Sequence, residues 1–249
     1  MIRLEAVKMS KSSMEMTILV VEDHDFSRKQ NLAMLIRIGF ENVLSAKNGE
    51  EAIEKLNQHK IDLVITDINM PSMNGMSLIK QVRLGNTKNK KQLKIIAITS
   101  YSNIKVITTC MELDIDGFLV KPIAVKPLTE KIKSALSESS NLYHESKYPQ
   151  IETTFDSLSD DALTLSEVDD IYEKPLTVNT ENTDVISNIK QLKEGMVLVE
   201  GIYTKNGSCL ICADIVLNEK HLNRLIELES IILTKEIRVT WGEVPQCSN

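Results

Sequence analysis

Five short, almost wholly apolar runs in the first 140 residues constrain the fold of this chain more than any other feature. The runs are ILVV (18–21), VLSA (43–46), LVIT (63–66), IIAI (95–98) and FLV (118–120). Such runs are typical of parallel strands covered on both faces. Amphipathic stretches separate them, and Gly39, Gly85 and Gly117 are predicted to end helical segments. The alternation predicts an α/β fold with a doubly wound, five-stranded parallel sheet.

Composition places the chain among ordinary globular proteins. It has 249 residues, 42% hydrophobic and 26% charged, which excludes wholesale disorder and suggests two folded units. No apolar run approaches the roughly 18 residues needed to span a bilayer, and the N-terminus lacks the apolar core of a secretory signal. We therefore expect a soluble, cytoplasmic protein without a membrane partner.

Cysteine usage gives no disulfide framework, since there are only four cysteines. Cys209 and Cys212 form a CxxC pair, but it lies in the apolar run CLICADIVL with no second pair and no nearby histidine. Packed thiols are favoured over zinc or redox chemistry.

An acidic stretch predicts the domain boundary. From Ser137 to Asp184 there are twelve acidic residues and two basic ones, with many Ser and Thr and little periodicity. Such a segment is typical of a solvated, self-repelling linker. We expect a flexible tail (1–13), an N-terminal domain (14–140), an acidic linker (141–184) and a small α+β domain (185–249).

Polar residues follow the predicted strands of the first domain. Glu22 and Asp23 end the first strand, Asp67 the third, Thr99 the fourth and Lys121 the fifth. The carboxyl ends of parallel strands meet at one edge of a sheet, so three carboxylates, a hydroxyl and an ammonium group are expected to converge there.

This set of groups indicates phosphoryl transfer. Three adjacent carboxylates need a counter-charge, and a few carboxylates with retained waters suit Mg²⁺ better than Ca²⁺. Phosphoryl transfer requires charge compensation and alignment, which a metal and Lys121 would supply. Asp67, central at the end of the third strand, is the expected nucleophile and would form an acyl phosphate.

Four motifs then carry a family resemblance. VVEDHD, DINMPSMNG, ITS and FLVKP, in this order, resemble the chemotaxis-regulator-like receiver domain of bacterial two-component response regulators over residues 14–140. The separations of 44 residues from Asp23 to Asp67, 32 to Thr99 and 22 to Lys121 are similar to those of the family, with a slightly longer loop after the third helix. The resemblance implies a flavodoxin-like sheet with strand order 2-1-3-4-5.

The resemblance also implies roles for individual residues. Asp67 would accept phosphate from a histidine kinase or a phosphotransfer protein, and Lys121 and Thr99 would assist. Mg²⁺ would be held by Asp23, Asp67, the backbone carbonyl of Asn69 and, through water, Glu22.

The family's switch pair corresponds to Thr99 and Phe118. It would link the site to the face formed by the receiver's fourth helix, fifth strand and fifth helix, which is the candidate homodimer surface. Enzymatic activity beyond Mg²⁺-dependent self-phosphorylation and autodephosphorylation is not expected.

The C-terminal residues predict a β-hairpin–helix–strand unit. Asn206-Gly207 signals a hairpin turn, Asn218 is a candidate cap for a helix through Glu229, and IILTKEIRVTW predicts a strand ending at Trp241. The order of elements over residues 185–245 is weakly similar to a small module found beside HD-GYP-type phosphodiesterases. The HD and GYP catalytic motifs of such enzymes are missing from this second half.

Three output roles remain open for the chain as a whole. The preferred one is a response regulator whose C-terminal module binds a protein partner of unknown identity. A phosphate sink or relay intermediate is the first alternative. A DNA-binding transcriptional regulator is the second, but nucleic acid is disfavoured as a partner because the single predicted helix mixes Lys220 and Arg224 with glutamates.

Overall fold

A computed structural model describes residues 15–99, 104–142, 145–154, 183–204 and 209–241. The chain divides into two compact units: residues 1–100 with 115–150, and residues 101–114 with 151–249. The predicted tail (1–13), most of the acidic linker and the Asn206-Gly207 turn lie outside the described residues. The four domain boundaries therefore stay predictions.

A five-stranded parallel sheet forms the centre of the first unit. Its strands are β1 (Thr17–Val21), β2 (Asn42–Ala46), β3 (Leu63–Asp67), β4 (Lys94–Thr99) and β5 (Gly117–Val120). They are hydrogen-bonded in the order β2-β1-β3-β4-β5. Each predicted apolar run lies in one strand, so the doubly wound sheet and its strand order are confirmed.

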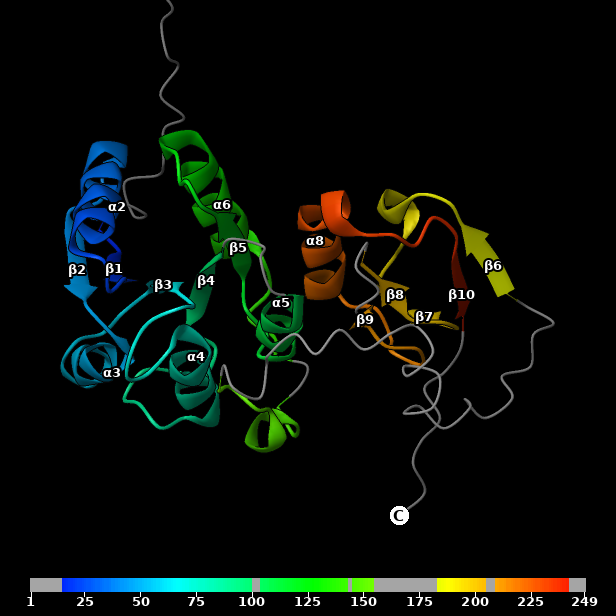
Figure 1. The fold of residues 1–249 in the computed structure, drawn as a ribbon, viewed down its shortest axis with the longest axis horizontal. Coiled ribbons are helices and arrows are strands. Elements are labelled where there is room, and N and C mark those ends of the chain that lie inside the picture. The colour runs from blue at the N-terminus through cyan, green and yellow to red at the C-terminus, as the bar shows by residue number, and fades with distance from the viewer. Residues whose placement is uncertain (1–14, 100–103, 143–144, 155–182, 205–208, 242–249) are drawn as a thin grey trace, which may run out of the picture. The chain divides into compact units, whose positions relative to one another are not determined.

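Helices cover both faces of this sheet (Figure 1). The α-helices among the described residues of this unit are α2 (Asp25–Ile38), α3 (Gly49–Gln58), α4 (Gly75–Leu84) and α6 (Val125–Ser137). Helices α2 and α6 contact each other on one face, and α3 and α4 contact each other on the other. Under α2 and α6 lies an apolar cluster that includes Val20, Leu35, Ile65, Ile98 and Ile132. Burial on both faces explains why the strands are almost wholly apolar.

Two of the three predicted glycine caps are confirmed. Gly39 and Gly85 follow α2 and α4 in the left-handed conformation that glycine adopts without steric cost. The third prediction was wrong, because Gly117 is the first residue of β5. The left-handed residue before it is Asp114, with φ of 51°. Aspartate tolerates this conformation better than most residues, so no glycine marks that turn.

Part of the predicted acidic linker is ordered against the first unit. The short 3₁₀ helix η1 (Tyr148–Gln150) contacts α4, and the Tyr148 side chain is fully buried. Lys80 Nζ donates a hydrogen bond of 3.0 Å to the carbonyl of Pro149. Burial of the large tyrosine ring stabilises this attachment.

The part of the second unit that the structure describes combines two α-helices with two small sheets. Its elements are α5 (Ile104–Glu112), β6 (Thr183–Ile186), η4 (Ile189–Gln191), β7 (Met196–Leu198), β8 (Ile202–Tyr203), β9 (Cys209–Ile211), α8 (Glu219–Glu227), η5 (Glu229–Ile231) and β10 (Ile237–Trp241). The sheets have the orders β6-β10-β7 and β8-β9, all antiparallel. Pairing of β8 with β9 confirms the predicted hairpin, and Asn218 caps α8 by accepting from the His221 amide at 2.8 Å.

Other details of the second unit differ from the predictions. Helix α8 ends at Glu227 rather than Glu229, and the last strand begins at Ile237 because a 3₁₀ turn occupies 229–231. Strand β6 was not predicted, since TDVI is short and half polar. Cys212 is exposed just past β9 and forms no disulfide with a described cysteine, so the prediction of two packed thiols was wrong for it. Among the described residues, none of the helices has both the length and the apolar character needed to cross a bilayer.

Candidate functional site

Three carboxylates meet at the carboxyl edge of the five-stranded sheet. Asp67 is the last residue of β3, and Glu22 and Asp23 follow β1. One carboxylate oxygen from each lies within 4.8 Å of the others. Asp67 is 6% exposed and Glu22 only 1%, whereas Asp23 faces solvent. The predicted convergence of these side chains is therefore present in the structure.

The Asp67 carboxylate is held in a fixed orientation by its own turn. Its Oδ1 atom accepts from the Ile68 amide at 2.7 Å and from the Asn69 amide at 3.3 Å. These bonds fold residues 68–69 over one side of the carboxylate. Asn69 is exposed at this edge, and the role of its carbonyl as a metal ligand stays a prediction.

Lys121 supplies the positive charge of the site. Its Nζ atom lies 2.5 Å from Asp67 Oδ2 and 3.2 Å from Glu22 Oε2. Partial burial of the ammonium acts to lower the pKa of Lys121, but the hydrogen bonds and charges of Asp67 and Glu22 outweigh it and raise that pKa. Burial, followed by repulsion from Asp67, raises the pKa of Glu22. The cluster thus carries more negative charge than one lysine balances.

The two predicted switch residues lie on adjacent strands. Thr99 is the last residue of β4 and is buried, and its carbonyl accepts from the Lys121 amide at 3.0 Å. Phe118, on β5, is buried and lies in register with Ala97 of β4. Strand pairing therefore connects both residues to the segment that carries Lys121.

Two residues that sequence reasoning did not identify position the β1–α2 turn. Arg28 Nη1 donates to the carbonyl of Glu22 at 2.8 Å and to that of Asp23 at 3.2 Å, from one turn into α2. His24 is exposed and caps α2, because its Nδ1 atom accepts from the Ser27 amide. Neither contact is associated with a residue pattern by which it could be predicted from the sequence.

Gly75 is a third residue that the site requires. Its amide donates to the Ile68 carbonyl at 3.0 Å. A Cβ atom there would overlap the Asp67 carbonyl oxygen and lie 2.8 Å from Ile68 Cα. Backbone atoms cannot move aside as a flexible side chain can. Glycine is thus needed for the start of α4 to approach the Asp67 turn.

Gly75→Ala is expected to destabilise the protein by about 1–3 kcal/mol, because the new methyl group displaces the backbone of Asp67 and Ile68. Urea denaturation monitored by circular dichroism measures this change. Gly117→Ala is the matched control, since its Cβ would meet chiefly the flexible Lys131 side chain. Equal effects of the two substitutions would contradict the explanation.

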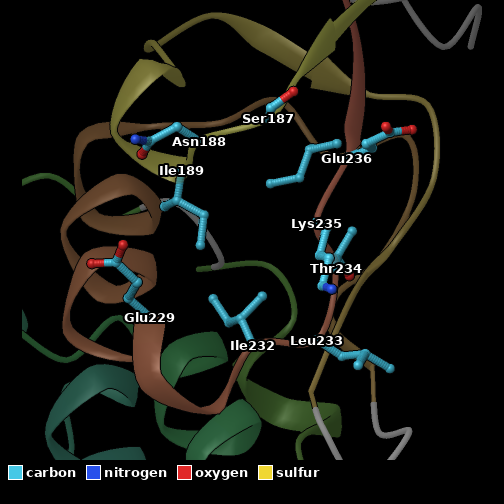
Figure 2. A pocket seen from close by; sticks show the side chains of 10 residues that line it. Ser187, Asn188, Ile189, Glu229, Ile232, Leu233, Thr234, Lys235 and Glu236 are labelled. Carbon is cyan, nitrogen blue, oxygen red and sulfur yellow. The ribbon is translucent and has the colours of Figure 1, made fainter.

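The structure has hollows in both units. One, of about 390 Å³, adjoins the carboxylates and is lined by Glu22, Asn31, Met34 and Lys121 among others. The second, of about 550 Å³, lies in the second unit, where Ile189 of η4 and Ile232, just past η5, face it (Figure 2). Among the described residues, only Glu22, Asp23 and Asp67 form a cluster suited to a metal ion. The site chemistry is therefore assigned to the sheet edge of the first unit.

The donor atoms at this edge fit Mg²⁺. All three side chains offer carboxylate oxygens, the hard ligands that Mg²⁺ takes, and exposed Asp23 leaves room for retained waters. Three carboxylates beside the single ammonium group of Lys121 leave excess negative charge at this edge, which favours a divalent cation.

Comparison with known proteins agrees with this geometry. Residues 18–133 match the response regulator receiver domain. Chemotaxis protein CheY1 of Helicobacter pylori is 38% identical over 122 residues, which cover 49% of this chain and 97% of that protein. A cyclic di-GMP phosphodiesterase of Thermotoga maritima is 31% identical over 121 residues, which cover 49% of this chain and 31% of that protein, so less than a third of the phosphodiesterase is matched.

Solved structures also resemble part of this chain. CheY4 of Vibrio cholerae is 26% identical with a TM-score of 0.45, and the alignment covers 49% of this chain and 98% of that one. In each of these comparisons about half of this chain is matched.

Proposed function

This chain belongs to the response regulator receiver family, and from that premise we propose that Asp67 accepts a phosphoryl group from the phosphohistidine of a histidine kinase or phosphotransfer protein. One observation carries the proposal: a nearly buried carboxylate, oriented by two amides, faces Lys121 beside two further carboxylates. Such a group is placed for covalent catalysis at an exposed sheet edge.

Asp67 performs the proposed transfer, and the two amides beside it orient its carboxylate. A carboxylate oxygen of Asp67 attacks phosphorus, the new O–P bond forms, and the N–P bond of the donor breaks with its electron pair left on the imidazole. The amides of Ile68 and Asn69 keep the carboxylate from rotating, which holds it ready for in-line attack.

Asp23, Asp67 and the Asn69 carbonyl would hold Mg²⁺ directly, with Glu22 acting through water. When bound, the ion supplies charge neutralisation for the transferring phosphoryl oxygens. Lys121 would exchange its contact with Asp67 for one with a phosphoryl oxygen, and the Thr99 hydroxyl would donate to another.

Lys121→Met is expected to slow Mg²⁺-dependent labelling by acetyl phosphate by about 100-fold or more, because it removes a charged donor to the transferring group. Isothermal titration should show that Mg²⁺ binding is retained, since the three carboxylates remain. Lys126→Met is the control, as Lys126 is 83% exposed and pairs only loosely with Glu130 in the structure. A labelling rate close to that of the unmodified protein would exclude this role for Lys121.

For the output we propose a non-enzymatic interaction role for the C-terminal residues. Movement of Thr99 toward the phosphoryl group, with rotation of Phe118, would pass the signal to the helix–strand–helix face of the receiver. Lys220 and Arg224 are both buried, so α8 does not offer them to a DNA backbone. Binding of a protein, or of a second copy of the chain, is therefore favoured over binding of DNA.

The proposed phosphoacceptor is tested by locating the adduct. The full chain is incubated with acetyl phosphate and Mg²⁺, the acyl phosphate is reduced with borohydride, and the modified residue is identified by peptide mass spectrometry. Modification of Asp67 supports the proposal, whereas modification elsewhere, or none, refutes it. Size-exclusion chromatography with beryllofluoride then tests the output. A change in oligomeric state or partner binding supports it, and no change would favour a phosphate sink.

A further inference from the structure

Helix α5 ends without a basic residue of its own. The Leu113 amide donates to Thr109 and the Asp114 amide to Met111, both at 3.0 Å, before Asp114 turns into the left-handed conformation. The last turn contains Glu112 and no basic residue. A carboxylate beside the negative end of the helix dipole is unfavourable, whereas a cation there is stabilising. Within the last turn of α5 no residue can supply that cation, so it must come from another segment.

Lys220 of α8 supplies that cation. Its Nζ atom donates to the Asp114 carbonyl at 3.0 Å, across 106 residues of sequence. Lys220 is only 3% exposed. A buried ammonium group is tolerated only where it is well hydrogen-bonded, so this contact is more specific than a surface ion pair. Within the same unit α5 also contacts β9.

The sequence of α5 makes the helix depend on its partners. Five of its nine residues, in IKVITTCME, are β-branched, and these lose side-chain freedom in a helix. Helices this short are marginal alone, so packing decides the stability of α5. The chain enters α5 only a few residues after Thr99, the proposed switch residue at the end of β4.

We infer that the ligand of the C-terminal module, here residues 183–241, is helix α5 of the same chain, which Lys220 holds at its C-terminal end. The module thereby responds to the state of the receiver through α5, the helix that follows β4 in the chain. Only the response of this contact to phosphorylation rests on the proposed function of Asp67.

Hydrogen exchange of the full chain tests whether Lys220 stabilises the C-terminal end of α5. Lys220→Met keeps the apolar stem and removes the ammonium group, and amides of residues 108–114 should exchange about tenfold faster, while those of β10 keep their protection. Lys220→Arg should retain protection, and Lys193→Met, at an exposed lysine of the same module, should change nothing. Unchanged exchange of residues 108–114 in Lys220→Met would overturn the inference.

A second measurement uses the unmodified chain, so it still tests the inference if Lys220→Met fails to fold. Beryllofluoride with Mg²⁺ should change the exchange of α5 and of α8 together, in the same direction. A change in α5 alone, or in neither helix although Asp67 is labelled by acetyl phosphate, would overturn the coupling. If Asp67 is not labelled at all, the proposed function fails, and the Lys220 variants still decide whether the module binds α5.

Discussion

Asp67→Asn is expected to abolish the acid-labile adduct that acetyl phosphate forms in the presence of Mg²⁺. The substitution keeps the size of the side chain and the acceptor for the Ile68 and Asn69 amides, but an amide oxygen is not a competent nucleophile. Loss of labelling would therefore report the chemistry of Asp67 rather than a collapse of its turn. Intact-mass spectrometry under mildly alkaline and acidic conditions measures the adduct.

The stability of Asp67→Asn provides an independent readout. Burial, followed by repulsion from Asp67, raises the pKa of Glu22. Removing the Asp67 charge relieves this repulsion but also weakens the contact with Lys121, so stability in Mg²⁺-free buffer should change by no more than about 1 kcal/mol. The rise in melting temperature on adding Mg²⁺ should shrink, because a ligand of the ion is lost. Asp62→Asn is the matched control. Asp62 accepts from the Thr17 amide at the opposite end of the strands and should label normally. A labelled Asp67→Asn protein would remove Asp67 from its proposed role.

The central sheet and its carboxylate edge could be predicted because each depends on local sequence signals. Five buried strands leave five apolar runs, and the residue after each run must lie at the sheet edge. Glu22, Asp67 and Lys121 are therefore found by position along the chain alone. Their 2.5 Å and 3.2 Å contacts follow from strand order, which came from the family resemblance.

The positioning residues could not be predicted because their contacts are long-range or purely steric. Arg28 binds backbone carbonyls, which every residue has, and Gly75 is required by atoms of Asp67 and Ile68 rather than by a turn. The Lys220 contact joins segments 106 residues apart. Strand β6 was missed because a short edge strand with polar residues has no distinctive alternation.

A buried charge network at the opposite edge of the sheet could not be predicted from sequence patterns either. Arg83 is fully buried and its Nη1 atom donates to the carbonyls of Lys91 and Leu93, at 2.5 Å and 2.8 Å. The Asp116 side chain is 1% exposed, and its Oδ2 atom lies 3.4 Å from Arg83 Nη2 and accepts from the Ile95 amide. Its Oδ1 atom lies 3.2 Å from Lys94 Nζ. Lys94 Nζ also donates to the carbonyls of Glu138 and Ser139, just past α6, at 2.9 Å each. Asp116, just before β5, thus joins α4 to β4, and Lys94 extends the network to the segment just past α6.

Asp116→Ala is expected to destabilise the receiver by about 3–5 kcal/mol, because it leaves two buried cations without their common counter-charge. Asp116→Asn should be less severe, as its amide oxygen can still accept from the Ile95 amide. Urea denaturation followed by circular dichroism measures the loss, and the fluorescence of Trp241 on β10 reports the second unit separately. Glu145→Ala removes the exposed Lys91–Glu145 pair of the same unit and should cost less than about 1 kcal/mol. Comparable losses in Asp116→Ala and Glu145→Ala would mean that burial does not set the strength of this network.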